Sequence, residues 1–201
     1  MKIFAVLGSR NQQGKTAALT KALLHGLKEK GAATEMLFLT SVTLKACRQC
    51  EEDGWGICHS EGRCVIEDDF DSIVKNIDGA DAVIFSTPVY YADMSESMKT
   101  FTDRLRRCNA PIISRTKENR NFKPVIGICH AGGGGGGAET CVVNLKKVLS
   151  QCGFEVIDMV PVRRQTLPIK LKNLESIGEW LFDHIETGEW ERVIPRPKSV
   201  K

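Results

Sequence analysis

The sequence lacks long hydrophobic runs and any strong imbalance of charge. No apolar stretch approaches the roughly 18 residues of a membrane-spanning helix, so we expect no membrane partner. The 28 basic and 25 acidic residues leave a formal net charge of +3, which is too small to indicate a nucleic-acid partner. The first apolar run begins at Ile3 and leaves no room for a signal peptide, so we expect a cytoplasmic protein.

Short apolar runs alternate with segments in which apolar residues recur at helical spacing. With 201 residues, 42% of them hydrophobic, the chain can bury a sizeable core. The expected strands are 3–7, 35–39, 82–85, 125–129 and 154–160, and the expected helical faces are 19–27, 70–77, 94–105, 142–149 and 174–185. This alternation predicts an α/β fold with a five-stranded parallel sheet covered on both faces.

The loop after the first predicted strand has the composition of an anion site. It runs from Gly8-Ser9 to Gly14-Lys15-Thr16, where the first helix begins. Free backbone N–H groups and the positive end of a helix would meet there, which suits a phosphate. A P-loop needs four residues between its first glycine and Gly-Lys-Thr, but five separate Gly8 from Gly14. A phosphotransferase is therefore a remote alternative, and a plain turn without a ligand is another.

Two further loops follow predicted strands at the same edge of the sheet. The segment 86–91 contains Pro88 and the adjacent pair Tyr90-Tyr91, and six consecutive glycines, 132–137, follow His130-Ala131. Parallel sheets bind ligands at the carboxyl ends of their strands. The six glycines formally satisfy a dinucleotide-binding pattern, but such a run satisfies nearly any glycine pattern, so we interpret it as a pliable loop. A phosphorylated flat ring suits this combination.

Eight cysteines form two groups. Four of them, Cys108, Cys129, Cys141 and Cys152, lie in apolar segments where core packing explains them. The other four, Cys47, Cys50, Cys58 and Cys64, crowd into one long polar segment. Four thiolates are enough for an iron–sulfur cluster or a structural zinc ion, and four reduced thiols in a lid carrying Trp55 are the alternative.

An ordered set of motifs carries a family resemblance. The motifs are Gly8-Ser9 to Gly14-Lys15-Thr16, Cys47-x-x-Cys50, Cys64-Val65-Ile66-Glu67-Asp68-Asp69-Phe70, Thr87-Pro88-Val89-Tyr90-Tyr91, Lys99-x-x-x-Asp103-Arg104 and the glycine run. Together they resemble the flavodoxin-like NAD(P)H-dependent FMN reductase family, particularly its iron-sulfur flavoprotein branch. The resemblance implies a doubly wound, three-layer α/β/α domain over 1–188, with a cysteine-rich insertion at about 40–64 and a tail at 189–201.

The resemblance also implies which residues hold FMN. The phosphate would be held by Ser9, Asn11, Gly14, Lys15 and Thr16. The ring would be flanked by Thr87, Pro88, Val89, Tyr90 and Tyr91, with Ala131, Gly132 and Gly133 approaching it from the glycine run. The residues Lys99, Asp103 and Arg104 would form a structural ion-pair network.

The implied activity is electron transfer from NAD(P)H through FMN to a small-molecule or protein acceptor, in a homodimer or homotetramer. An iron-sulfur electron-transfer flavoprotein without nicotinamide activity is the alternative, and a non-enzymatic redox or metal sensor is a third. Cys47, Cys50, Cys58 and Cys64 would hold a 4Fe-4S cluster, although seven residues separate Cys50 from Cys58 where the branch is compact. No catalytic side chain is required, and for Tyr90 and His130 packing or solvent exposure is favoured over proton handling.

Overall fold

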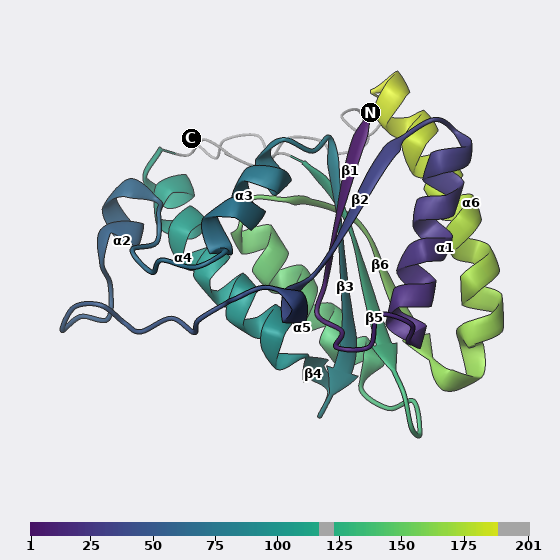
Figure 1. Ribbon diagram of the computed structural model, residues 1–201, viewed down its shortest axis with the longest axis horizontal. Helices are drawn as coiled ribbons and strands as arrows, with labels where there is room; N and C mark the ends of the chain where they lie inside the picture. Colours follow the sequence, from purple (N-terminus) through teal and green to yellow (C-terminus); the bar gives the residue numbers. More distant parts are fainter. Residues whose placement is uncertain (117–122, 189–201) are drawn as a thin grey trace, which may run out of the picture.

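Five parallel strands form the centre of the computed structural model, which describes residues 1–116 and 123–188 (Figure 1). They are β1 (Lys2–Leu7), β2 (Ala33–Phe38), β3 (Ala82–Tyr90), β5 (Pro124–Ala131) and β6 (Glu155–Arg163), in the spatial order β2-β1-β3-β5-β6. A two-residue strand, β4 (Asp93–Met94), pairs antiparallel with the end of β3. The predicted five-stranded parallel sheet is confirmed, and β4 is an addition to it.

Helices cover both faces of the sheet, which confirms the three-layer α/β/α prediction. One face carries α1 (Lys15–Glu29) and α6 (Leu167–Thr187), and the other carries α3 (Phe70–Asp78), α4 (Glu96–Thr116) and α5 (Ala138–Gln151) (Figure 1). The remaining helices are short: α2 (Ile57–Glu61) and the 3-10 turns η1 (Leu39–Ser41) and η2 (Arg164–Thr166). None of the helices in the two described ranges is long and apolar enough to cross a membrane.

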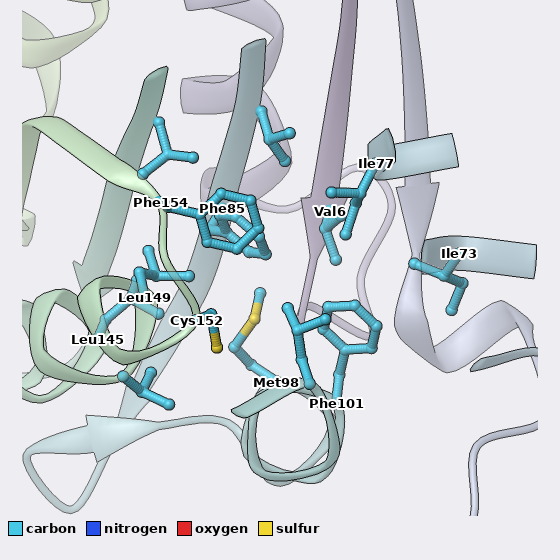
Figure 2. Packing of buried hydrophobic residues seen from close by; sticks show 14 of the residues in the cluster. Val6, Ile73, Ile77, Phe85, Met98, Phe101, Leu145, Leu149, Cys152 and Phe154 are labelled. Atoms are coloured by element: carbon cyan, nitrogen blue, oxygen red, sulfur yellow. The ribbon is translucent and has the colours of Figure 1, made fainter. Parts of the chain in front are cut away.

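The alternation of side chains along the strands divides the core in two. In β1, Phe4 and Val6 belong to the cluster under α3, α4 and α5, whereas Ile3, Ala5 and Leu7 belong to the cluster under α1 and α6. Figure 2 shows the first cluster, in which the rings of Phe85 and Phe154 lie 5.5 Å apart and Met98 and Phe101 project from α4. Because helices bury both faces, the inner strands are mostly apolar rather than alternating with polar residues, and their buried polar residues lie toward the carboxyl ends of β3 and β5.

The structure extends two elements beyond their predicted ends. β3 continues through Tyr90, although the sequence predicted a loop from Ser86, because Pro88 still pairs with His130 of β5. α4 continues through Pro111, although a polar connection was predicted from Asn109 to Lys123. Proline costs helix stability, but Cys108 and Ile112 keep the inner face of this helix buried beyond Leu105. The predicted C-terminal tail, 189–201, lies outside the described residues.

Two glycines let α1 and α6 pack backbone against backbone. A Cβ atom added to Gly26 would lie 2.0 Å from the carbonyl oxygen of Glu175, and one added to Gly178 would lie 2.2 Å from that of Leu23. Neither contact can be relieved by rotating a side chain, since the obstructing atoms belong to the main chain. The spacing of these two helices therefore depends on glycine at both positions.

We expect Gly26→Ala to lower the free energy of unfolding by about 1–3 kcal/mol, as overpacking does in other cores. Helix propensity alone would raise it by about 1 kcal/mol, so the sign distinguishes the two effects. Denaturant unfolding measures the change. Ala18→Gly, at an exposed position of the same helix, gives the propensity effect alone, and a stabilised Gly26→Ala variant would contradict the proposed contact.

Candidate functional site

The three predicted loops meet at the carboxyl edge of the sheet, which lies at the bottom of Figure 1. The β1–α1 loop (residues 8–14) is tied to β3 by a hydrogen bond from the Gly8 N–H to the Ser86 carbonyl, 2.9 Å long. The glycine loop (residues 132–137) packs against the turn after β3, where a Cβ on Gly137 would lie 2.6 Å from Cα of Ala92. The prediction that these loops share one edge is confirmed by the strand order.

A buried hydroxyl network fixes the start of the β1–α1 loop. Ser95 Oγ donates to the Gly8 carbonyl at 2.8 Å, and the Ser95 N–H donates to Thr87 Oγ1 at 2.9 Å. A Cβ on Gly8 would lie 2.3 Å from that same Ser95 oxygen. Thr87 Oγ1 also donates to the Pro88 carbonyl at 2.9 Å. Thr87, which was predicted to flank the ring, is thus buried, and its hydroxyl already has hydrogen-bond partners within the protein.

The rest of this loop presents the N-terminus of α1 without a cap. Gly14 stands at the N-cap position with no side-chain hydrogen bond, and the first turn contains no acidic residue. Asn11 Oδ1 accepts the Gln13 N–H at 2.9 Å, and the Asn11 carbonyl accepts the Gly14 N–H at 3.0 Å. The loop is therefore shaped by its own bonds, while the positive end of α1 is left for an anion.

The predicted phosphate residues lie around this helix end with different exposure. Ser9 and Thr16 are buried, whereas Asn11 and Lys15 are exposed. Ser9 Oγ donates to the Asn11 carbonyl at 3.3 Å, a long bond that a phosphate oxygen could replace. The structure brings these residues together at one helix N-terminus.

An open cavity of about 420 Å³ lies beside the tyrosine pair, and its lining is Arg10, Val89, Tyr90, Tyr91 and Glu96. The volume falls within the range of about 300–1,000 Å³ that is typical of ligand sites. Tyr91 is fully exposed and has a left-handed backbone, with φ of 48°. Arg10 and Glu96 were not predicted as site residues. Arg10 follows the first predicted strand and stands between two predicted site residues, which is a signal that could have found it, whereas Glu96 lies at the start of a predicted helix and carries no such signal.

The glycine loop leaves a bare backbone next to open space. A Cβ on Gly132, Gly133, Gly134 or Gly136 would meet nothing within 4 Å, so internal packing does not require glycine there. Gly135, in contrast, is held by Arg163, whose Nε donates to its carbonyl at 3.1 Å. A flat ring can approach such a backbone closely, because no side chains intervene.

His130 is buried at the end of β5, and its Nε2 atom has no hydrogen-bond partner among the described residues. Its strand position places it on the α1 side of the sheet with Ile126 and Ile128. Burial lowers the pKa of His130, and the positive charge of Lys15 lowers it further. A buried polar atom without a partner is uncommon and needs an explanation, such as a group that binds there.

The four predicted metal-binding cysteines line a second pocket. Cys47, Cys50, Cys58 and Cys64 belong to the cysteine segment (residues 42–69), and this pocket lies between that segment and α4. The buried Cys108 of α4 lines this pocket as well. The sequence had predicted only a role in core packing for this cysteine. Its position four residues after Arg104, on the same helix face, is the signal that could have found it.

The chemistry of this donor set suits an iron–sulfur cluster or zinc, because both bind thiolates. In the present arrangement, however, no three histidine, cysteine, aspartate or glutamate side chains in the described ranges are grouped closely enough to hold a metal ion. The segment thus supplies suitable ligands along one pocket and would have to contract around a metal to bind it.

The predicted network of Lys99, Asp103 and Arg104 is wrong in its connectivity. Lys99 and Asp103 form an exposed pair one helical turn apart, 3.4 Å between Nζ and Oδ1. Arg104 points to the opposite, buried side of α4 and pairs with Asp68 at 2.6 Å. Residues that follow one another on a helix face different directions, so Arg104 cannot share the surface pair.

The acid side of the stability curve should depend on His130. Its pKa in the folded protein is below the ordinary 6.5, so the unfolded chain binds a proton more readily and stability falls as the pH drops below 6.5. We expect His130→Gln to make this fall shallower in urea unfolding measured over a pH series. His25→Gln, at an exposed position of α1, is the matched control, and an unchanged slope in His130→Gln would contradict the prediction.

A family model described as NADPH-dependent FMN reductase matches residues 1–171 of this chain. An iron-sulfur flavoprotein of Methanocaldococcus jannaschii is 31% identical over 81% of this chain and 75% of its own length. A second iron-sulfur flavoprotein of that archaeon is 35% identical, over 53% of this chain and 52% of its own length. An iron-sulfur flavoprotein of Archaeoglobus fulgidus is 34% identical over 46% of its length, so the chain spans about half the length of these latter two relatives.

Solved structures show the same fold at low identity. An NAD(P)H:quinone oxidoreductase from Methanothermobacter marburgensis superposes with a TM-score of 0.65 and 22% identity, covering 90% of this chain and 96% of that one. An archaeal flavodoxin superposes with a TM-score of 0.59 and 15% identity, covering 92% and 99%. The fold is therefore flavodoxin-like. The protein belongs to the NADPH-dependent FMN reductase family, in the branch whose curated members are named iron-sulfur flavoproteins.

Proposed function

We propose that this protein binds FMN at the carboxyl edge and passes electrons from NAD(P)H to a small-molecule or protein acceptor. The observation that carries the proposal is the convergence of an uncapped helix N-terminus, an open tyrosine-lined cavity and a bare glycine backbone at one edge. The buried, unpartnered Nε2 of His130 on the α1 side of that edge adds to the fit. Family membership agrees with the same cofactor.

The residues divide the binding work between the two ends of FMN. Hydroxyls of Ser9 and Thr16, the N–H groups in the first turn of α1 after Gly14 and the charge of Lys15 would hold the phosphate. On the ring side, Pro88, Val89, Tyr90 and Tyr91 would line the ring, and main-chain groups of Ala131, Gly132 and Gly133 would approach it from the glycine loop. Asn11 contributes by shaping the loop, since its side chain already accepts the Gln13 N–H.

When bound, FMN supplies hydride and electron transfer, and the protein supplies position and electrostatics. We therefore assign no catalytic acid or base. Neutral His130 is suited to orient a polar atom without adding a charge to the site, because burial keeps its pKa low. Tyr91 projects into solvent beside the cavity, so a second subunit of a homodimer or homotetramer would have an aromatic contact there.

We further propose that Cys47, Cys50, Cys58 and Cys64 hold a 4Fe-4S cluster. The shared pocket supports this, as does the fact that the curated relatives are named iron-sulfur flavoproteins. Zinc is the competing occupant, because it accepts the same four thiolates. An electron-transfer flavoprotein without nicotinamide activity would use the same two sites.

Purified, anaerobically handled protein should show a resolved two-band flavin spectrum, with a broad added shoulder if the cluster is present. NADH and NADPH oxidation in the presence of a quinone then tests the nicotinamide step. A colourless protein that cannot be reconstituted with FMN would contradict the proposal. A flavin spectrum without nicotinamide oxidation would favour the electron-transfer alternative, and ATP hydrolysis without a chromophore would favour a phosphotransferase.

Lys15→Met should weaken FMN binding about tenfold, the equivalent of about 1.4 kcal/mol, because a charged partner of the phosphate is lost. Riboflavin lacks the phosphate, so its affinity should not change. Quenching of flavin fluorescence measures both. Lys21→Met, at an exposed position further along α1, controls for the loss of surface charge. Equal weakening of FMN and riboflavin would mean that Lys15 does not contact the phosphate.

A further inference from the structure

Arg104 is an almost completely buried arginine at the wall of the cysteine pocket. Its side chain is 1% exposed, and that of its partner Asp68 is 0% exposed. The guanidinium binds the carboxylate through both amino groups, Nη1 to Oδ2 at 2.6 Å and Nη2 to Oδ1 at 3.0 Å. This two-pronged geometry fixes the plane of the guanidinium as well as its position.

The same guanidinium reaches both ends of the cysteine segment. Nη2 donates to Cys64 Sγ at 3.3 Å and to the Ile66 carbonyl at 3.4 Å, while Nη1 donates to the Lys45 carbonyl at 3.1 Å. One side chain of α4 therefore holds the chain shortly before Cys47 and the chain at Cys64. The intervening cysteines lie in the span between these two attachments.

Asp68 is held as firmly as the arginine. It accepts the Lys45 N–H at 2.8 Å through Oδ2 and the Phe70 N–H at 3.1 Å through Oδ1. The Phe70 ring lies beneath the guanidinium, 4.2 Å from its carbon. Buried ion pairs gain little stability over an apolar pair, so this arrangement suggests a requirement for charge at this place.

A second arginine lines the pocket. Arg107 lines it beside Arg104 and stacks on the Trp55 ring at 4.1 Å. The buried Nε of Arg104 has no hydrogen-bond partner among the residues that the structure describes. The pocket thus has two arginine side chains in its wall, which is in keeping with an occupant of negative charge.

We infer that Arg104 is a positioning residue of the cysteine pocket, which holds Cys64 through its sulfur and makes a cluster bound there easier to reduce. The inference rests on the proposed cluster for its second part. A reduced cluster carries one more negative charge, and a hydrogen bond to a ligand sulfur together with a nearby cation stabilises that charge. Asp68 in turn keeps the guanidinium in place.

The reduction potential of the reconstituted cluster tests the electrostatic part. After loading with iron and sulfide, Arg104→Gln should shift the redox equilibrium at least tenfold toward the oxidised cluster, about 59 mV for one electron. Arg104→Lys should shift it less, because it keeps the charge but loses the two-pronged geometry. Arg106→Gln, on the same helix but outside the pocket, should leave the potential unchanged.

Arg104→Gln leaves the buried Asp68 carboxylate without its charged partner, so the double variant Arg104→Gln/Asp68→Asn is made alongside it. The double variant removes both charges, so it should fold and still show a lower potential, since the bond to Cys64 is lost. A loaded double variant with the potential of the unaltered protein would overturn the electrostatic part.

Hydrogen–deuterium exchange on cluster-free protein tests positioning without any cluster. The double variant should exchange faster over residues 45–67 and at the unaltered rate in β1 and β3. Unchanged exchange in the segment would overturn the positioning role. If the unaltered protein takes up FMN but no iron, the cluster proposal and the electrostatic part both fail, and the exchange result alone decides on positioning.

Discussion

The structure depends on the need to bury both faces of a sheet whose inner strands are mostly apolar. β1 sends Phe4 and Val6 to one face and Ile3, Ala5 and Leu7 to the other, so helices must cover both sides. The strand order β2-β1-β3-β5-β6 extends from β1 toward β2 on one side and through β3 toward β6 on the other. Because these strands are parallel, every connection from a strand to the helix that follows it starts at the same edge of the sheet. Site residues far apart in the sequence thereby meet without any contact designed for that purpose.

Glycine has two opposite roles in this arrangement. At Gly8, Gly26 and Gly178 the absence of a side chain permits close internal contact, and a methyl group would strike neighbouring atoms. At Gly132 and Gly133 nothing lies nearby, and the bare backbone faces open space. The first kind maintains the spacing of elements, and the second kind leaves room for a ligand. The sequence alone does not distinguish them, because the neighbours come from remote parts of the chain.

Local patterns were enough to predict the strands, most helices and the edge at which the three loops meet. They failed where a tertiary contact decides the outcome. β3 reaches Tyr90 only because β4 and β5 pair with it, and α4 passes Pro111 because its inner face stays buried. The bond between Arg104 and Asp68 joins residues 36 positions apart. Both residues stand in recognised motifs, but local spacing predicted a different partner for the arginine.

α4 touches both pockets. Its first residue, Glu96, lines the tyrosine cavity, and Arg104 lines the cysteine pocket two turns later. Eight residues of helix rise about 12 Å, so the separation of the two sites is set by one continuous rod. Under the proposed function, the distance that an electron would cover between the two sites therefore stays nearly constant. The helix then serves as a spacer of fixed length between the two proposed cofactor sites.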